Sequence, residues 1–242
     1  LLAGGVIGGV FGASGGAGVV SDATGIVLAA AGDAFIGLLA VCLLEFRDHE
    51  RRQSPEWKER LARLDDHKLP VYTILIPMYR EAESLPGLLE SMRRLDYPAS
   101  KLDIKLVLEA DDRETLEAAQ ALRPKYQFEI IRVPASDPRT KPKACNYALR
   151  FARGEFVTIF DADDRPERQQ IRKAVYAFRH LPPEIVCLQA RLNYYNADDN
   201  LLTRFFSLEY TILFHFMLPG LERLGIPIPL GVTSNRIALA RL

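Results

Sequence analysis

The chain between residues 70 and 200 alternates between short β-branched runs and stretches whose apolar residues recur at helical spacing. The run VYTILIP (71–77) predicts a strand, and the leucines after it predict a helix with Ser84 as N-cap and Pro86 in its first turn. By the same patterns, further strands are expected at 104–109, 127–132 and 155–160, with helices near 113–122 and 142–152. Because strands and helices alternate, the pattern predicts an α/β fold with a parallel sheet covered on both faces.

Residues 1–46 have a different character, because they contain no Lys or Arg. The stretch GIVLAAAGDAFIGLLAVCLLEF (25–46) has about the length that crosses a bilayer as a helix, so it predicts a transmembrane helix. Residues 1–20 are also uncharged but include eight glycines, which disfavour a helix. These residues form either a first span that closes a hairpin or a flexible leader.

Basic residues gather directly after this apolar stretch, between residues 47 and 69. Since Lys and Arg are enriched on the cytoplasmic side of membrane segments, we expect a plasma membrane or inner membrane protein whose soluble domain is cytoplasmic. The chain then divides into a membrane segment, a basic linker, an α/β core and a C-terminal segment: 1–46, 47–69, 70–200 and 201–242.

The segment FFSLEYTILFHFMLPGLERLGIPIPLG (205–231) is rich in aromatics and leucine, but Glu209, His215 and Glu222 interrupt it. It is too polar to predict a membrane span. Two interpretations remain open, an interfacial helix that lies on the membrane surface and a buried core helix.

Composition narrows the classes of function. The 242 residues are 48% hydrophobic and 26% charged, which excludes a disordered chain. The 31 Lys and Arg residues balance 31 Asp and Glu residues, so nucleic acid is not an expected partner. The three cysteines lie far apart, which predicts neither a disulfide framework nor a cysteine metal site.

Charged residues follow the predicted strands. Ligands of open α/β sheets bind beyond the carboxyl ends of the strands, and acids and lysines are found there: Glu81, Glu109, Asp111, Lys141, Asp161 and Asp163. Two carboxylates at positions i and i+2 suit Mg²⁺ or Mn²⁺, which would neutralise a diphosphate, although such a pair is also common in solvated turns. The sequence contains neither GxxxxGK[ST] nor GxGxxG, so no P-loop or classical dinucleotide site is expected.

Four segments resemble one known family in their order and spacing. They are similar to the core of family 2 inverting glycosyltransferases: VYTILIPMYREAESLPGLLESMRRLDYP, EADD, KPKACNYALRFARGEF and VTIFDADDRPE. The likeness covers roughly residues 70–235 and is greatest to membrane-bound cellulose synthase-like and exopolysaccharide synthases. It implies a GT-A fold with a Rossmann-like, mostly parallel sheet, a UDP-sugar donor, a divalent metal ion and a polysaccharide or other glycan acceptor.

The resemblance also implies roles for individual residues at the nucleoside. It places Tyr79 and Glu81 beside the nucleoside, on the loop that begins at Pro77. Glu109 stands where the family has the first Asp of a turn that contacts the base, and Asp111 shares this role because the turn reads EADD here.

Further roles concern the diphosphate, the metal and the sugar. Lys141 matches a lysine expected near the diphosphate, while Asp161 and Asp163 match the metal-contacting DxD motif. The resemblance places five residues on the sugar and acceptor side: Gln189, Arg191, Gly231, Thr233 and Ser234.

The sequence departs from the family after the last of these residues. The TED motif, whose Asp is the general base, and the QxxRW motif of processive members are not found in this sequence, so the base is expected beyond Leu242. The resemblance therefore predicts a C-terminally truncated transferase. Two alternatives are a donor-binding pseudoenzyme or fragment, and a phosphohydrolase with an Asp nucleophile in IFDADD.

Overall fold

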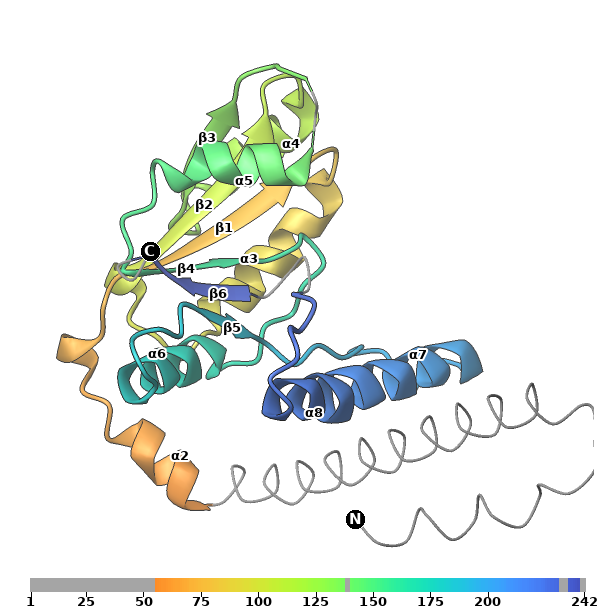
Figure 1. Ribbon diagram of the computed structural model, residues 1–242. Helices are drawn as coiled ribbons and strands as arrows, with labels where there is room; N and C mark the ends of the chain where they lie inside the picture. The colour runs from red at the N-terminus through yellow and green to blue at the C-terminus, as the bar shows by residue number, and fades with distance from the viewer. Residues whose placement is uncertain (1–54, 138–139, 231–234, 240–242) are drawn as a thin grey trace, which may run out of the picture. The chain divides into compact units, whose positions relative to one another are not determined.

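The computed structural model describes residues 55–137, 140–230 and 235–239 (Figure 1). The predicted membrane segment, residues 1–46, lies outside the described residues. The chain divides into two compact units, of which the larger comprises Pro55–Arg191 and Leu230–Leu242. The smaller contains Leu192–Pro229 and the N-terminal residues up to Ser54.

The larger unit is built on a six-stranded sheet with the order β3-β2-β1-β4-β6-β5. The strands are β1 (Tyr72–Met78), β2 (Leu102–Glu109), β3 (Glu129–Val133), β4 (Phe156–Ile159), β5 (Cys187–Gln189) and β6 (Asn235–Ala238). The first four are parallel, as the sequence predicts, whereas β6 is antiparallel to both β4 and β5. The α/β fold is therefore confirmed, with a sheet that is mixed and mostly parallel.

Three helices lie between the parallel strands, close to the predicted positions: α3 (Leu85–Arg93), α4 (Arg113–Leu122) and α5 (Lys141–Leu149). Two more helices flank this part of the chain, α2 (Pro55–Ala62) before β1 and α6 (Gln170–His180) after β4. Ser84 is the N-cap residue of α3 and Pro86 lies in its first turn, as predicted. The Ser84 side chain makes no capping hydrogen bond, and a 3₁₀ turn, η2 (Ala82–Ser84), precedes the helix.

The sheet has a core on each face, because neighbouring strand residues point in opposite directions. On β1, Ile74 and Ile76 pack with residues of α3 and α6, whereas Leu75 packs with Ala144 and Ala148 of α5. Figure 1 shows α3 and α5 on opposite faces of the sheet. Both faces are thus covered, and the carboxyl ends of the strands are left for a ligand.

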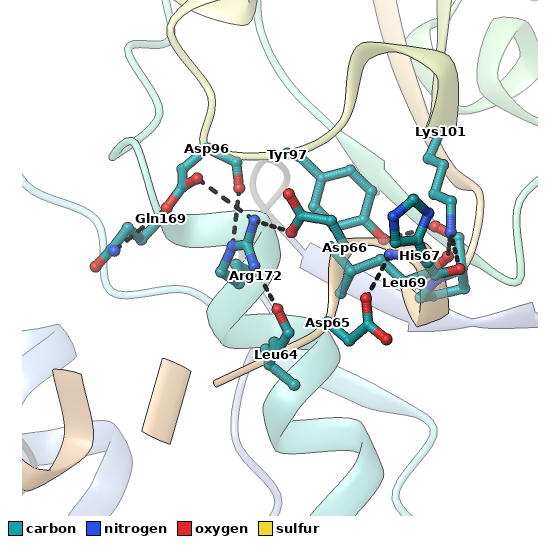
Figure 2. A network of polar contacts seen from close by, with 11 residues as sticks. Leu64, Asp65, Asp66, His67, Leu69, Asp96, Tyr97, Lys101, Gln169 and Arg172 are labelled. Atoms are coloured by element: carbon teal, nitrogen blue, oxygen red, sulfur yellow. Dashed lines mark hydrogen bonds and ion pairs between the residues drawn. The ribbon is translucent and has the colours of Figure 1, made fainter. Parts of the chain in front are cut away.

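The described part of the basic linker, residues 55–69, is held against the larger unit by a buried arginine of α6. The guanidinium of Arg172 donates hydrogen bonds to the Leu64 carbonyl at 3.3 Å and to the carboxylates of Asp66 at 2.7 Å and Asp96 at 3.4 Å. It also donates to the backbone carbonyl of Asp96 at 3.2 Å, and Figure 2 shows these contacts converging on one side chain. The linker is therefore docked to the core by charge-assisted hydrogen bonds.

A second polar network lies at the amino-terminal ends of β1, β2 and β4, opposite the carboxyl ends. The buried hydroxyl of Thr73 donates to Asp103 at 2.9 Å and accepts from the Gly154 amide at 2.9 Å. Arg153 and the buried Lys105 form ion pairs with Asp103, and both also pair with Glu129. A Cβ atom on Gly154 would lie 2.5 Å from the Thr73 nitrogen, so this close approach of two backbones requires glycine.

The smaller unit contains one long helical stretch, Leu201–Arg223, made of α7 (Leu201–Thr211), the π-helical η4 (Ile212–Met217) and α8 (Leu218–Arg223). Asn200 and Thr203 form a capping box at its start. Among the described residues, it is the one helix long and apolar enough to cross a membrane, with a mean hydropathy of 1.2. Only 11% of its apolar window is buried, which disagrees with the interpretation as a buried core helix.

Candidate active site

A cavity of about 510 Å³ opens at the carboxyl ends of β1, β2 and β4, a volume in the usual range for small-molecule sites. Of the residues predicted to act there, seven line it: Pro77, Tyr79, Glu81, Glu109, Lys141, Asp161 and Asp163. The structure thus brings together four loops that are distant in sequence. The individual roles of these residues remain predictions.

The other predicted site residues either do not line this cavity or fall outside the described part of the chain. Asp111 is exposed and does not line the cavity, and neither do Gln189 and Arg191. Gln189 belongs to β5, where it pairs with Asn235 of β6, and its side-chain amide donates to the Ala190 carbonyl at 3.0 Å. Three predicted residues fall outside the described part of the chain: Gly231, Thr233 and Ser234.

The turn after β4 holds its two metal-binding candidates in different environments. Asp164 braces this turn, because its carboxylate accepts a 2.8 Å hydrogen bond from the Asp161 amide and its own amide donates to the Asp161 carbonyl at 3.1 Å. The Asp161 carboxylate accepts a hydrogen bond from the ammonium of Lys141, the first residue of α5. Asp163 is exposed at the cavity wall. The sequence pattern predicted roles for Asp161 and Asp163 but not for Asp164, which stabilises the turn.

Glu81 adds a third carboxylate at this end of the cavity. Its pKa is raised above the ordinary value, first by burial and then by the negative charges of Asp163 and Asp161, while Lys141 acts in the opposite direction. Oxygen ligands of this kind suit a hard divalent cation. Among the described residues, however, no three such groups already converge on one point in the manner of a formed metal site.

The loop that carries Tyr79 and Glu81 is held by hydrogen bonds to the first turn of α4 and its N-cap residue. Arg80 adopts the left-handed conformation with φ of 57°, and its amide donates to the carboxylate of Asp112 at 2.7 Å. The Glu81 amide donates to the buried Thr115 hydroxyl at 3.2 Å. The guanidinium of Arg80 lies 5.1 Å from the centre of the Tyr79 ring, a cation–π contact.

Asp112 was not predicted as a site residue, and its partners show what it does. It is the N-cap of α4 and also accepts from the Thr115 amide at 3.1 Å. Burial favours its neutral form, but hydrogen bonds from Arg80 and Thr115 outweigh this and hold the pKa of Asp112 below the ordinary value. A usable signal was present, since Asp directly before a helical run is a preferred N-cap residue.

At the other end of the cavity, Glu109 forms an ion pair with Lys143, the neighbour of Lys141 along α5. The Lys143 ammonium lies 3.3 Å from a Glu109 carboxylate oxygen. It also donates to the carbonyls of Pro134 and Ser136, at 3.4 Å and 3.3 Å. Two lysines of one helix turn thus contact two different acids, Lys141 with Asp161 and Lys143 with Glu109.

A mostly parallel α/β sheet with acids and a lysine at its carboxyl edge is typical of the class of proteins that bind charged small molecules at the ends of their strands. Comparison with known families makes the assignment specific. Residues 73–237 match the family described as "Glycosyl transferase family 2", and the chain belongs to this family.

Relatives of known name share part of the chain. "Probable glycosyltransferase YdaM" of Bacillus subtilis is 28% identical over 171 residues, which are 70% of this chain and 39% of that protein. "Probable glucomannan 4-beta-mannosyltransferase 1" of Arabidopsis thaliana is 31% identical over 61% of this chain and 27% of its own length. The chain therefore spans well under half of these relatives.

Among solved structures, the mannosyltransferase PcManGT of Pyrobaculum calidifontis, in complex with GDP-Man and Mn²⁺, is 26% identical to this chain. The likeness covers 65% of this chain and 48% of that one, with a TM-score of 0.45. The family assignment depends on the sequence match and not on this structure.

Proposed function

We propose that this chain binds a UDP-sugar and transfers the sugar with inversion to a polysaccharide or other glycan acceptor. The observation that carries the proposal is that a family 2 chain gathers Lys141, Asp161 and Asp163 at one end of a shared cavity and Glu109 at the other. Charged groups at the first end suit a diphosphate, so the nucleoside would extend across Tyr79 toward Glu109.

Asp161 and Asp163 would hold Mg²⁺ or Mn²⁺. The donor chemistry fits, because both are carboxylates at the end of β4 and Glu81 contributes a third acid to the same wall. A bound ion would supply positive charge that stabilises the departing UDP. Lys141 would add to this from the first turn of α5, where the helix N-terminus also favours negative charge.

The acceptor side would be formed by Gln189 and Arg191 together with the loop that contains Gly231, Thr233 and Ser234. Inversion requires the acceptor oxygen to attack the anomeric carbon in line with the departing diphosphate. We assign the general base to none of the acids of this chain.

Membrane association is part of the proposal and is supported by the helical stretch Leu201–Arg223. Its large apolar side chains are exposed, among them Leu201, Phe205 and Leu208. A helix with such a face suits the interfacial region of a bilayer, with the α/β unit in the cytoplasm. Binding of the chain to lipid vesicles, measured by flotation, tests this part separately.

Donor binding is tested by calorimetry on the whole chain with UDP in excess Mn²⁺. We expect wild-type binding, and a loss of metal-dependent binding in Asp163→Asn. Unchanged UDP affinity in this variant would contradict the metal role of Asp163. Incubation with radiolabelled UDP-sugars then separates a transferase, which forms a product, from a donor-binding pseudoenzyme, which retains UDP but forms none.

A further inference from the structure

The cavity lining is strongly unbalanced in charge. Among its described lining residues, Lys141 is the only base, against four acids: Glu81, Glu109, Asp161 and Asp163. Glu109 has a partner outside the lining, because it pairs with Lys143. Among the described residues that line the other end, the positive charge comes from one ammonium group on a flexible stem, and this group contacts Asp161.

The contact between Lys141 and Asp161 is incompatible with full use of the Asp161 carboxylate by a metal. A cation bound to Asp161 would be repelled by an ammonium at hydrogen-bond distance from the same group. Glu81, Asp161 and Asp163 line the same cavity, and burial first and then the negative charges of Asp163 and Asp161 raise the pKa of Glu81, although among the described residues no three of these acids converge on one point. The lysine is therefore a competitor for the place of a divalent ion.

A nucleoside diphosphate changes this competition. Its phosphate oxygens offer the Lys141 ammonium several negative acceptors, to which charge-assisted hydrogen bonds are strong. When the ammonium moves to the diphosphate, the negative charge of the Asp161 carboxylate is no longer compensated by Lys141. The carboxylate then binds a divalent cation more strongly. Diphosphate binding and metal binding then favour each other.

We propose that Lys141 is the resident counter-ion of Asp161, which keeps the affinity for a divalent cation low until a diphosphate draws the ammonium away. The inference rests on the proposed donor binding and adds that the metal ion and the nucleotide bind cooperatively. Linkage requires that the coupling be reciprocal, so the metal raises the affinity for the nucleotide by the same factor.

The test measures Mn²⁺ binding to the whole chain without nucleotide, from the electron paramagnetic resonance signal of free Mn²⁺. Lys141→Met should bind Mn²⁺ about fivefold more tightly than wild type, the size expected for loss of a partly exposed ion pair. The same variant should bind UDP more weakly, by about tenfold, because a charge-assisted contact is lost. The factor by which UDP increases Mn²⁺ affinity should shrink in proportion.

Lys143→Met is the matched control. It removes an ammonium group of the same kind two residues along α5, and this group contacts Glu109 and not Asp161. It should leave Mn²⁺ affinity without nucleotide close to wild type. Lys141→Gln provides a second, polar variant if Lys141→Met does not fold, as judged by circular dichroism.

The proposal is overturned if Lys141→Met binds Mn²⁺ no more tightly than wild type, or if Lys143→Met tightens it equally. It is also overturned if neither wild type nor the Lys141 variants bind Mn²⁺ without nucleotide. If wild type binds UDP with Mn²⁺ in any of these cases, the proposed function stands and only the counter-ion role is lost. If wild type binds no UDP, donor binding itself is contradicted.

Discussion

The amide of Arg80, a residue in the left-handed conformation, donates a 2.7 Å hydrogen bond to the buried carboxylate of Asp112. A non-glycine residue in this conformation costs roughly 1–2 kcal/mol, so the surrounding structure must hold it there. Arg80 separates Tyr79 from Glu81, and both of these line the cavity. Asp112 therefore positions two site residues although it does not line the cavity itself.

Asp112→Asn should loosen this turn. Asn offers one oxygen to two amides, those of Arg80 and Thr115, so one of them loses its acceptor. We expect a loss of about 1–2 kcal/mol in the free energy of unfolding, measured by urea denaturation. The affinity for UDP should fall about fivefold in calorimetry, since the loop is no longer preorganised.

The exposed neighbour gives the matched control. Asp111→Asn should leave both stability and UDP affinity close to wild type, because Asp111 does not line the cavity. If Asp111→Asn weakens UDP binding more than Asp112→Asn does, then the assignment of Asp111 to the nucleotide from sequence is right and the positioning role of Asp112 is wrong.

The pH dependence of stability should report the same carboxylate. The pKa of Asp112 is lower in the folded chain than its ordinary value, so its ionised form stabilises the fold above that ordinary value. This contribution is lost as the pH falls below about 4 and through the folded pKa. The difference in unfolding free energy between wild type and Asp112→Asn should therefore shrink over this interval. A difference that stays constant from about pH 7 to about pH 3 would contradict the ionised role.

Arg172→Met should release the linker from α6. The substitution removes the donor shared by Leu64, Asp66 and Asp96, and the expected loss of stability is about 2 kcal/mol because Asp66 stays partly solvated. Hydrogen exchange of residues 59–69 should accelerate more than that of β1. Arg63→Met, which breaks only an exposed pair with Glu59, is the control and should change stability by less than about 0.5 kcal/mol.

Two glycines should respond oppositely to alanine. Gly154→Ala places a methyl group 2.5 Å from the Thr73 nitrogen and should destabilise the chain by about 1–3 kcal/mol. Gly87 lies in α3, where an added Cβ would meet nothing within 4 Å, so Gly87→Ala should stabilise by about 0.5–1 kcal/mol. Thermal unfolding of both variants checks the signs. Equal effects would show that the close approach at Gly154 is not rigid.

Prediction from sequence succeeded where a pattern is local. The helix expected near 113–122 runs from Arg113 to Leu122, and the parallel order of the first four strands placed Glu109, Lys141 and Asp161 at one edge. Both results follow from periodicity and from the rule that parallel strands end on the same side.

Prediction failed where the structure depends on contacts distant in sequence. β6 has only four residues, and its antiparallel place between β4 and β5 is set by partners far back in the chain. Asp111 and Asp112 are adjacent and chemically identical, so the start of α4 decides which of them is the N-cap residue. It is Asp112, and its carboxylate accepts the hydrogen bond of the Arg80 amide. The pairing of Lys143 with Glu109 likewise needs α5 and β2 to be placed first.

The position of β6 has a consequence for the order of assembly during synthesis. Within the described sheet, β5 pairs with β6 alone, and β6 in turn covers the side of β4 that β1 leaves open. A nascent chain that has not yet reached residue 235 therefore carries an uncovered β4 edge, and such edges readily recruit other strands. The four parallel strands can form early, but this edge stays vulnerable to aggregation until the ribosome has delivered β6.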